Sequence, residues 1–247
     1  MKKIILALMC ACALTLGAAI SSRAENTGVY IAPKFMMMWQ NSYSDLTRTI
    51  NGGRLHDESM ANSQFTLGGA LAVGYDFWEQ HRVPIRAEIE FALRGNNEYS
   101  DDYIDRRNLG GVREEFKFLY NASTLLANFY WDFHNSSDFT PYVSAGAGLA
   151  FIHSEYTHTY HPTVFTRGGS TSVSDDFTNF AWNVGAGIAY KINDNVSVDL
   201  GYRYLNLGNV SMSGSLRNAP FAGVTTSHDC DSYASNHEIM LGARFTF

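Results

Sequence analysis

The sequence predicts an all-β chain, an eight-stranded antiparallel transmembrane β-barrel, and three observations carry this prediction. Apolar and polar residues alternate with a period of two in eight stretches, as in strands with one apolar and one polar face. Most stretches are longer than the roughly five or six residues usual in soluble sheets, and they reach the roughly 9 to 11 that a tilted membrane-spanning strand needs. The connections between the stretches alternate between long and short, as in barrels that cross a membrane.

The last strand alternates most clearly, because every second residue from Ile239 to Phe247 is apolar while Glu238 and Arg244 lie on the other face. Pro33 lies within the first strand and cannot donate a backbone hydrogen bond, so we expect a bulge or a local break there. In chain order, the expected strands are residues 28–40, 65–78, 84–94, 115–133, 141–153, 179–192, 196–205 and 237–247.

The connections predict which end of the barrel faces which compartment. The long ones are residues 41–64, 95–114, 154–178 and 206–236, and the short ones are residues 79–83, 134–140 and 193–195. Membrane barrels combine short periplasmic turns with long extracellular loops, so we expect both termini at the periplasmic side.

The polar faces of the strands carry six basic and six acidic residues, which predicts a closed, ion-paired barrel interior rather than an open pore. Small residues recur as Gly-Ala-Gly at 146–148 and 185–187, which suits a narrow barrel. The residues expected in this interior charge network are Lys34, Asp76, Arg86, Glu88, Glu90, Arg94, Asp132, Lys191, Asp199, Arg203, Glu238 and Arg244.

A soluble lipocalin-like barrel, with its apolar face turned inward, is the alternative architecture with eight strands. Aromatic residues near the strand ends favour the membrane barrel, because such residues form girdles at the two membrane interfaces. The expected girdle residues are Trp39, Phe77, Phe91, Trp131, Phe151, Trp182, Tyr190, Tyr202, Phe245 and Phe247.

Residues 1–24 have the pattern of a secretory signal peptide, with Lys2 and Lys3, an apolar run over residues 4–20, and small residues before a cleavage site after Ala24. Residues 25–247 then form the barrel domain. The net charge of −6 argues against nucleic acid as a partner. Cys230 is the one cysteine after the expected cleavage site, so we expect a free thiol in a loop.

Three groups of residues could carry chemistry, and for each a structural role is favoured. Glu88 and Glu90 could form a catalytic carboxylate pair, but ion pairing inside the barrel explains them better. In the sequence His153-Ser154-Glu155, adjacent residues point to opposite faces of a strand and cannot form a triad. The remaining group could bind a metal but is expected to be solvated in loops: His158, His161, His228, Cys230 and His237. We therefore predict no catalytic residue, no metal and no cofactor.

The long connections contain tyrosines among Ser, Asn and Gly, a composition typical of binding surfaces, although such loops also fold over a barrel mouth. The candidate binding residues are Tyr43, Tyr99, Tyr103, Tyr156, Tyr160 and Tyr233.

The terminal Phe247, the alternating connection lengths, and the stretches Pro-Tyr-Val-Ser-Ala-Gly-Ala-Gly at 141–148 and Gly-Tyr-Arg-Tyr-Leu at 201–205 resemble the opacity-type, small OmpA-like outer-membrane proteins. The resemblance extends over residues 25–247. It implies a bacterial outer-membrane barrel with a structural and surface-interaction role, adhesin-like or antigen-like, through its extracellular loops. It also implies that Phe245 and Phe247 are the assembly signal.

The partners implied by the resemblance are outer-membrane lipid and lipopolysaccharide, the barrel assembly machinery, and ligands on host or other cells. A narrow small-solute porin is the alternative function, and a lipid-modifying barrel enzyme is a third.

Overall fold

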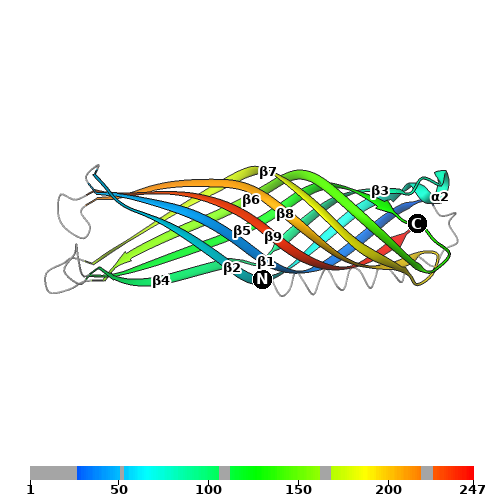
Figure 1. The fold of residues 1–247 in the computed structure, drawn as a ribbon, viewed down its shortest axis with the longest axis horizontal. Coiled ribbons are helices and arrows are strands. Elements are labelled where there is room, and N and C mark those ends of the chain that lie inside the picture. Colours follow the sequence, from blue (N-terminus) through cyan, green and yellow to red (C-terminus); the bar gives the residue numbers. More distant parts are fainter. Residues whose placement is uncertain (1–26, 51–52, 106–111, 162–167, 218–224) are drawn as a thin grey trace.

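The computed structural model describes residues 27–50, 53–105, 112–161, 168–217 and 225–247, so the expected signal peptide lies outside the described residues. Strands dominate the described chain, and they run along a long cylinder (Figure 1). The elements are β1 (Val29–Ile50), β2 (Gly53–Asp76), α2 (Phe77–His81), β3 (Ile85–Arg94), β4 (Asn97–Asp105), β5 (Val112–Asp132), β6 (Phe139–Tyr160), β7 (Gly169–Lys191), β8 (Val196–Arg217) and β9 (Thr225–Thr246). Within the described ranges, no helix has the length and apolar character needed to cross a membrane.

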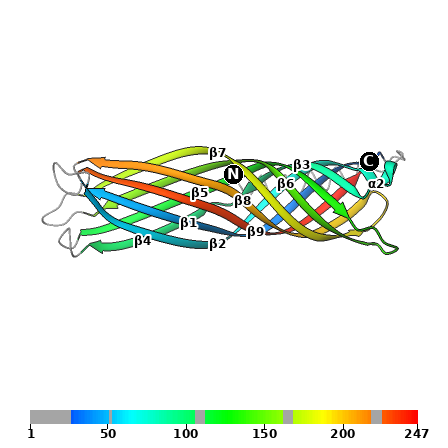
Figure 2. The same ribbon diagram turned by 45° about the horizontal axis from the view of Figure 1, so that its top comes forward.

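The strands form a closed antiparallel barrel. Each strand pairs with its neighbour in the chain except that β3 pairs with β5 rather than β4, and β1 pairs with β9 to close the barrel. Both β3 and β4 lie on the same edge of β5, separated by a break at residues 95–96, so together they act as one strand. The predicted eight-stranded barrel is therefore confirmed, and its strands coil around the long axis (Figure 2).

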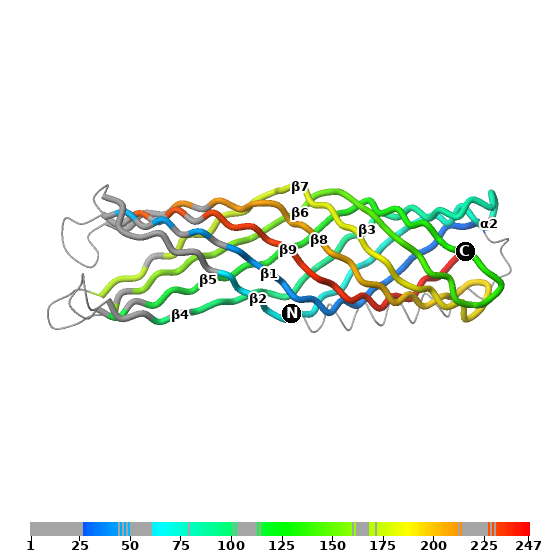
Figure 3. The backbone as a smooth tube through the Cα atoms, viewed as in Figure 1, coloured from blue at the N-terminus to red at the C-terminus, as the bar shows by residue number. Residues whose placement is uncertain are grey.

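Six strands, β1, β2 and β6 to β9, are nearly twice as long as the sequence pattern indicated, whereas β3 and β5 are close to the expected length. The segment from Val29 to Ile50 has 22 residues, which corresponds to roughly 70 Å along the strand. The expected long loops 41–64, 95–114, 154–178 and 206–236 are largely strand, and Cys230, expected in a loop, lies in β9. In Figure 3 the described strands run toward the end opposite the C-terminus, which we call the far end.

The half of the barrel next to the C-terminus carries an outward-facing apolar belt. Trp39 packs edge-on against Phe65 at the rim of the belt toward the far end, with ring centroids 5.4 Å apart. Phe139 packs against Tyr190, with centroids 4.8 Å apart, at the rim toward the end that holds the C-terminus, which we call the near end. From Val29 to Trp39 the belt spans roughly 33 Å along a tilted strand, which matches a band about 25 Å tall. The exposed belt residues include Leu67, Leu71, Val73, Ile89, Phe91, Leu125, Phe129, Trp131, Val143, Leu149, Phe151, Phe180, Trp182, Val184, Leu200, Tyr202 and Leu241.

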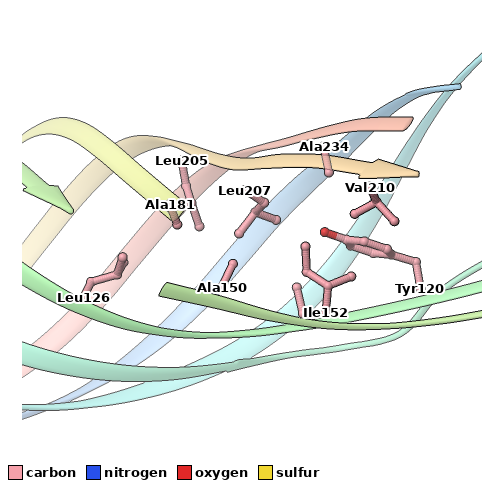
Figure 4. Close-up of a cluster of buried hydrophobic side chains, with 10 residues drawn as sticks. Tyr120, Leu126, Ala150, Ile152, Ala181, Leu205, Leu207, Val210 and Ala234 are labelled. Atoms are coloured by element: carbon pink, nitrogen blue, oxygen red, sulfur yellow. The ribbon is translucent and has the colours of Figure 1, made fainter. Parts of the chain in front are cut away.

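Beyond the belt the apolar face turns inward. In β5 the exposed apolar residues Leu125 and Phe129 lie on the odd positions, whereas Phe118, Tyr120 and Ala122 are apolar inward residues on even positions. We call the resulting buried cluster the apolar plug (Figure 4), whose side chains point toward one another between the strands. Its residues are Tyr120, Ala122, Leu126, Ala150, Ile152, Ala181, Leu205, Leu207, Val210 and Ala234.

The hydrogen-bonded ladder opens at two places near the far rim of the belt. Pairing of β7 with β8 ends at Trp182 and Asn206, and pairing of β2 with β3 ends at Gly68 and Arg94. Over the described residues, the far half therefore consists of two sheets, β8-β9-β1-β2 and β4-β5-β6-β7, that pack face to face across the apolar plug. At the far end, β1, β8 and β9 lie together on one side and β4 and β5 on the other (Figures 1 and 2).

Side-chain amides bridge both openings, which we call the seams. Asn179 of β7 donates from Nδ2 to the carbonyl oxygens of Leu207 (3.2 Å) and Asn209 (2.7 Å) in β8. Across the other seam, the backbone N–H of Glu98 donates to Oε1 of Gln64 at 3.0 Å. These bonds replace part of the missing ladder.

The C-terminal residue joins the two ends of the chain. The backbone N–H of Phe247 donates to the carbonyl oxygen of Val29 at 2.9 Å, and the carbonyl oxygen of Phe247 accepts from Thr27 N (2.5 Å) and Oγ1 (2.7 Å). Farther along, the pairing of β1 with β9 is interrupted between Ile31 and Lys34, so the break expected at Pro33 is present.

Deleting Phe247 should hinder barrel formation, because it removes these hydrogen bonds from the strands that close the barrel in hydrocarbon. We expect a smaller folded fraction, measured as heat-modifiable migration on gels of membranes from cells that make the variant. Deletion of Ala219, between β8 and β9, is the control and should fold as wild type. A folded Phe247 deletion beside an unfolded Ala219 deletion would refute this account of closure.

Replacing Leu207 of the apolar plug by Ala should destabilise the protein by about 2–5 kcal/mol, because the fully buried side chain leaves a cavity between the two sheets. Denaturant unfolding of the protein in micelles measures this change. The exposed Ser174→Ala should change the free energy of unfolding little. Equal effects of the two substitutions would contradict a packed interior in the far half.

Candidate functional site

Buried ion pairs cross the barrel lumen at the level of the apolar belt. Arg203 of β8 donates from Nη1 to Glu90 of β3 and from Nε to Glu238 of β9, both at 2.6 Å. Glu90 also accepts from Lys34 Nζ at 2.7 Å, and Glu238 from Arg94 Nε at 2.7 Å. All five side chains are at least nine-tenths buried. We call Lys34, Glu90, Arg203, Glu238 and Arg94 the ion-pair chain.

The strand period explains how these residues meet. Glu88, Glu90 and Arg94 are even-numbered residues of β3, so their side chains all point inward. Lys34 also contacts Glu88, which in addition accepts hydrogen bonds from the phenols of Tyr30 (3.2 Å) and Tyr130. The two carboxylates considered as a catalytic pair are thus both bound to Lys34.

A second buried pair lies closer to the near end. Arg86 donates from Nε and Nη2 to the two carboxylate oxygens of Asp132, at 2.6 and 2.8 Å, and its guanidinium lies over the ring of Tyr142 at 5.2 Å. Tyr142 has room because Gly187 and Gly201 face it. A Cβ at either glycine would lie 2.4 or 2.5 Å from the tyrosine oxygen.

The charges nearest the near end are paired more loosely. Arg244 lies 3.9 Å from Asp76 and 4.0 Å from Asp199, beyond hydrogen-bond distance. Asp76 also accepts from the backbone N–H of Trp78 and so caps α2. A cavity of about 20 Å³ adjoins Arg244 and Asp199, which is room for one or two water molecules.

Eleven of the twelve charged residues proposed for the interior therefore face it, and Lys191 does not. The Lys191 side chain is 53% exposed and contacts Asp194 of the following turn at 2.8 Å. Lys191 is the last residue of β7, so its side chain reaches out of the barrel mouth to a partner in water. The hydrogen bond from Lys191 lowers the pKa of Asp194.

The stretch at 153–155 does not assemble a triad, as the alternation of side chains predicts. Ser154 is buried with 0% exposure, whereas His153 points outward, 48% exposed, and contacts Asp176 at 2.7 Å. His158 corrects the expectation of solvated loop histidines, because it is fully buried in β6 and stacks on Phe116 at 4.3 Å. Residues 27–247, apart from the undescribed segments, hold no group of three His, Cys, Asp or Glu arranged to bind a metal.

All six candidate binding tyrosines lie on strands rather than in loops. Tyr43 is 59% exposed on β1 and Tyr99 is exposed on β4, so these two remain accessible. Tyr156 faces inward against the apolar plug. Tyr233 is partly exposed on β9, and the side chains of Tyr103 and Tyr160 lie outside the described part of the structure.

Sequence reasoning missed the inward tyrosines Tyr30, Tyr130 and Tyr142, which complete the polar interior. Tyr130 donates to Glu88, and Arg86 lies over its ring at 4.6 Å. These tyrosines lie on the polar face of their strands, and this position could have indicated that they face the interior. There a phenol can donate a hydrogen bond to a carboxylate while its ring fills the lumen.

The comparisons with known proteins agree with this architecture. The model of the family described as outer membrane protein beta-barrel domain matches residues 6–247. The outer membrane protein PagN of Salmonella typhimurium is 33% identical over 245 residues, which cover 96% of this chain and 97% of PagN. Opacity protein V28 of Neisseria gonorrhoeae is 26% identical and is matched over 72% of this chain and 76% of its own length.

Among solved structures, the outer membrane protein OprG from Pseudomonas aeruginosa superposes with a TM-score of 0.52 at 16% identity, covering 90% of this chain and 98% of OprG, which supports the fold alone. The far half of the barrel is accordingly extracellular and the near end periplasmic. The chain belongs to the outer membrane protein beta-barrel domain family and is an outer-membrane surface protein related to PagN and the opacity proteins.

Proposed function

We propose that the protein displays a rigid two-sheet structure above the outer membrane for adhesive contact with host or other cells. The observation that carries this proposal is the length of the strands beyond the apolar belt. In β1, residues 40–50 continue past Trp39, and the two sheets there are held together by the apolar plug. A barrel that only crossed the membrane would need roughly half of each strand.

The relationship to PagN, over nearly the whole of both chains, supports a shared surface role. In this proposal the chain is not an enzyme. Two partners are also part of the proposal. The barrel assembly machinery would recognise Phe245 and Phe247, and lipopolysaccharide would surround the apolar belt. Residues 1–24 would be removed as a signal peptide during export.

Shortening one extracellular hairpin tests the adhesive role. Asp45 pairs with Ser59, so replacing residues 46–58 by Asn-Gly joins these two residues through a two-residue turn and keeps the remaining register. We expect bacteria with this variant to attach to cultured epithelial cells several-fold less than wild type, at equal surface amount and equal heat-modifiable migration. Bacteria with Lys191→Ala, on the periplasmic side, should attach as wild type. Full attachment by the shortened variant would contradict a role for this hairpin.

The interior favours a closed barrel over a porin. The ion-pair chain occupies the lumen from β3 to β8 and β9, and the apolar plug lies above it. Eight strands give an interior only wide enough for side chains. Solutes would have to displace both layers.

We predict no large, steady open conductance for the wild-type protein in planar bilayers. Arg203→Ala should remove the shared partner of Glu90 and Glu238 and destabilise the barrel by about 3–5 kcal/mol, because both carboxylates stay buried. Lys191→Ala breaks an exposed pair and serves as the control, with little expected effect. A steady wild-type conductance of porin size would overturn the closed interior while leaving the adhesive role untouched.

A further inference from the structure

A group of aromatic side chains extends the far rim of the apolar belt upward on one side of the barrel. Tyr204 of β8 packs against Trp182 of β7 (centroids 5.7 Å apart) and against His237 of β9 (5.4 Å). The Tyr202 ring stacks on His237 at 6.1 Å, and Trp39 of β1 is the register partner of His237. Tyr43 of β1 is in turn the register partner of Tyr233, and we call Trp39, Tyr43, Trp182, Tyr202, Tyr204, Tyr233 and His237 the aromatic platform.

Hydrogen bonds fix the polar edges of this platform. The Tyr202 hydroxyl lies 2.7 Å from Nδ1 of His237, and the Tyr204 and Tyr233 hydroxyls lie 2.9 Å apart. Asn206 donates from Nδ2 to the Tyr233 oxygen. The platform therefore offers flat ring faces bordered by ordered hydroxyl, imidazole and amide groups.

The platform spans the polar layer of the outer leaflet. Tyr233 pairs with Tyr43, four residues beyond Trp39, which is roughly 13 Å along a tilted strand. The polar layer on each side of the hydrocarbon is about 5–8 Å thick. The platform thus begins at the lipid boundary and rises through the region where glycolipid sugars lie.

On the opposite side of the barrel, the described residues of β6 and β7 carry no comparable group of exposed aromatic rings beyond the belt. There, Phe151 is the last exposed aromatic residue of β6, and the outward residues that follow are His153 and Glu155, with Asp176 and Ser174 beside them on β7. Tyr99 of β4 is a further exposed aromatic residue of that sheet. A general interfacial girdle would be similar all round the barrel. The aromatic group around Tyr204 and His237 is therefore more extensive than anything described on the opposite side, which indicates a site for a particular ligand.

We propose that the aromatic platform binds neutral sugar rings of the outer-leaflet glycolipid, lipopolysaccharide. A sugar ring has an apolar face that fits an aromatic ring and a rim of hydroxyls that fits the platform's polar edges. The site is continuous with the lipid-facing belt, so a membrane glycolipid reaches it without leaving the bilayer. The outward residues directly above the platform, Asp45 and Asp231, are acidic and register partners, which disfavours the phosphate groups of the same lipid.

The test uses the full chain folded in phospholipid nanodiscs and a soluble probe, the lipopolysaccharide saccharide after removal of its acyl chains and phosphates. Binding is measured by saturation-transfer NMR. We expect Tyr204→Leu and Tyr43→Leu each to weaken binding, the former about tenfold. Phe151→Leu, at the same rim on the opposite side, should bind within twofold of wild type. Tyr43 is highly exposed, so its variant should fold even where Tyr204→Leu does not.

Raising the salt concentration distinguishes stacking from charge attraction, because screening weakens only the latter. Binding that persists at high salt and is lost in the platform variants supports the proposal. Binding only by the phosphorylated saccharide, loss of binding at high salt, or equal binding by all variants would overturn it. Cell attachment is a separate readout, so failure of this site would be distinguishable from failure of the adhesive role.

Discussion

The structure depends on the need to pair every backbone polar group that lies in hydrocarbon. Lipid offers no hydrogen-bond partner, so the strands that face it must form an uninterrupted closed ladder. The two seams obey this limit. They begin at Trp182 and Asn206 and at Gly68 and Arg94, close to the far rim of the apolar belt. Above that level water and the amides of Asn179 and Gln64 can satisfy the backbone. The barrel is therefore closed where closure is obligatory and divides into two sheets where it is not.

The same change of surroundings reverses the side chains. Next to lipid, the outward face is apolar and the interior holds charges that must be paired. Next to water, a sheet is stable when its apolar face is buried against another sheet, so the inward face becomes apolar. In β5 this exchange occurs between Leu125, which faces lipid, and Tyr120, which faces the apolar plug. Two chemically different fillings thus occupy one continuous lumen, the ion-pair chain below and the apolar plug above.

This reversal explains what the sequence could predict. Lipid imposes a strict period of two, so the eight strands, the inward charges and the closing strand up to Phe247 could be read directly. The far half lacked that signal, because apolar residues change from one parity to the other near the rim and several outward residues, such as Thr157 and Ser172, are only mildly polar. The sequence pattern therefore predicts a loop for Tyr156 and His158, although both face the interior. Lys191 has the right parity, but sequence alone cannot show that Asp194 offers it a partner in water.

The boundary between lipid and water also explains why aromatic residues gather around His237. On β8 and β9 the outward positions at the rim must suit neither pure hydrocarbon nor bulk water, and Tyr, Trp and His combine an apolar ring with a polar edge. A bulge between Asn206 and Asn209 shifts the β8 register at this height, and Gly208 adopts a φ of +79° there. The bulge lets Asn206 reach Tyr233 while Leu207 and Val210 still enter the apolar plug. One local irregularity thus serves the interior and the outer surface together, which links the packing of the far half to the geometry of the aromatic platform.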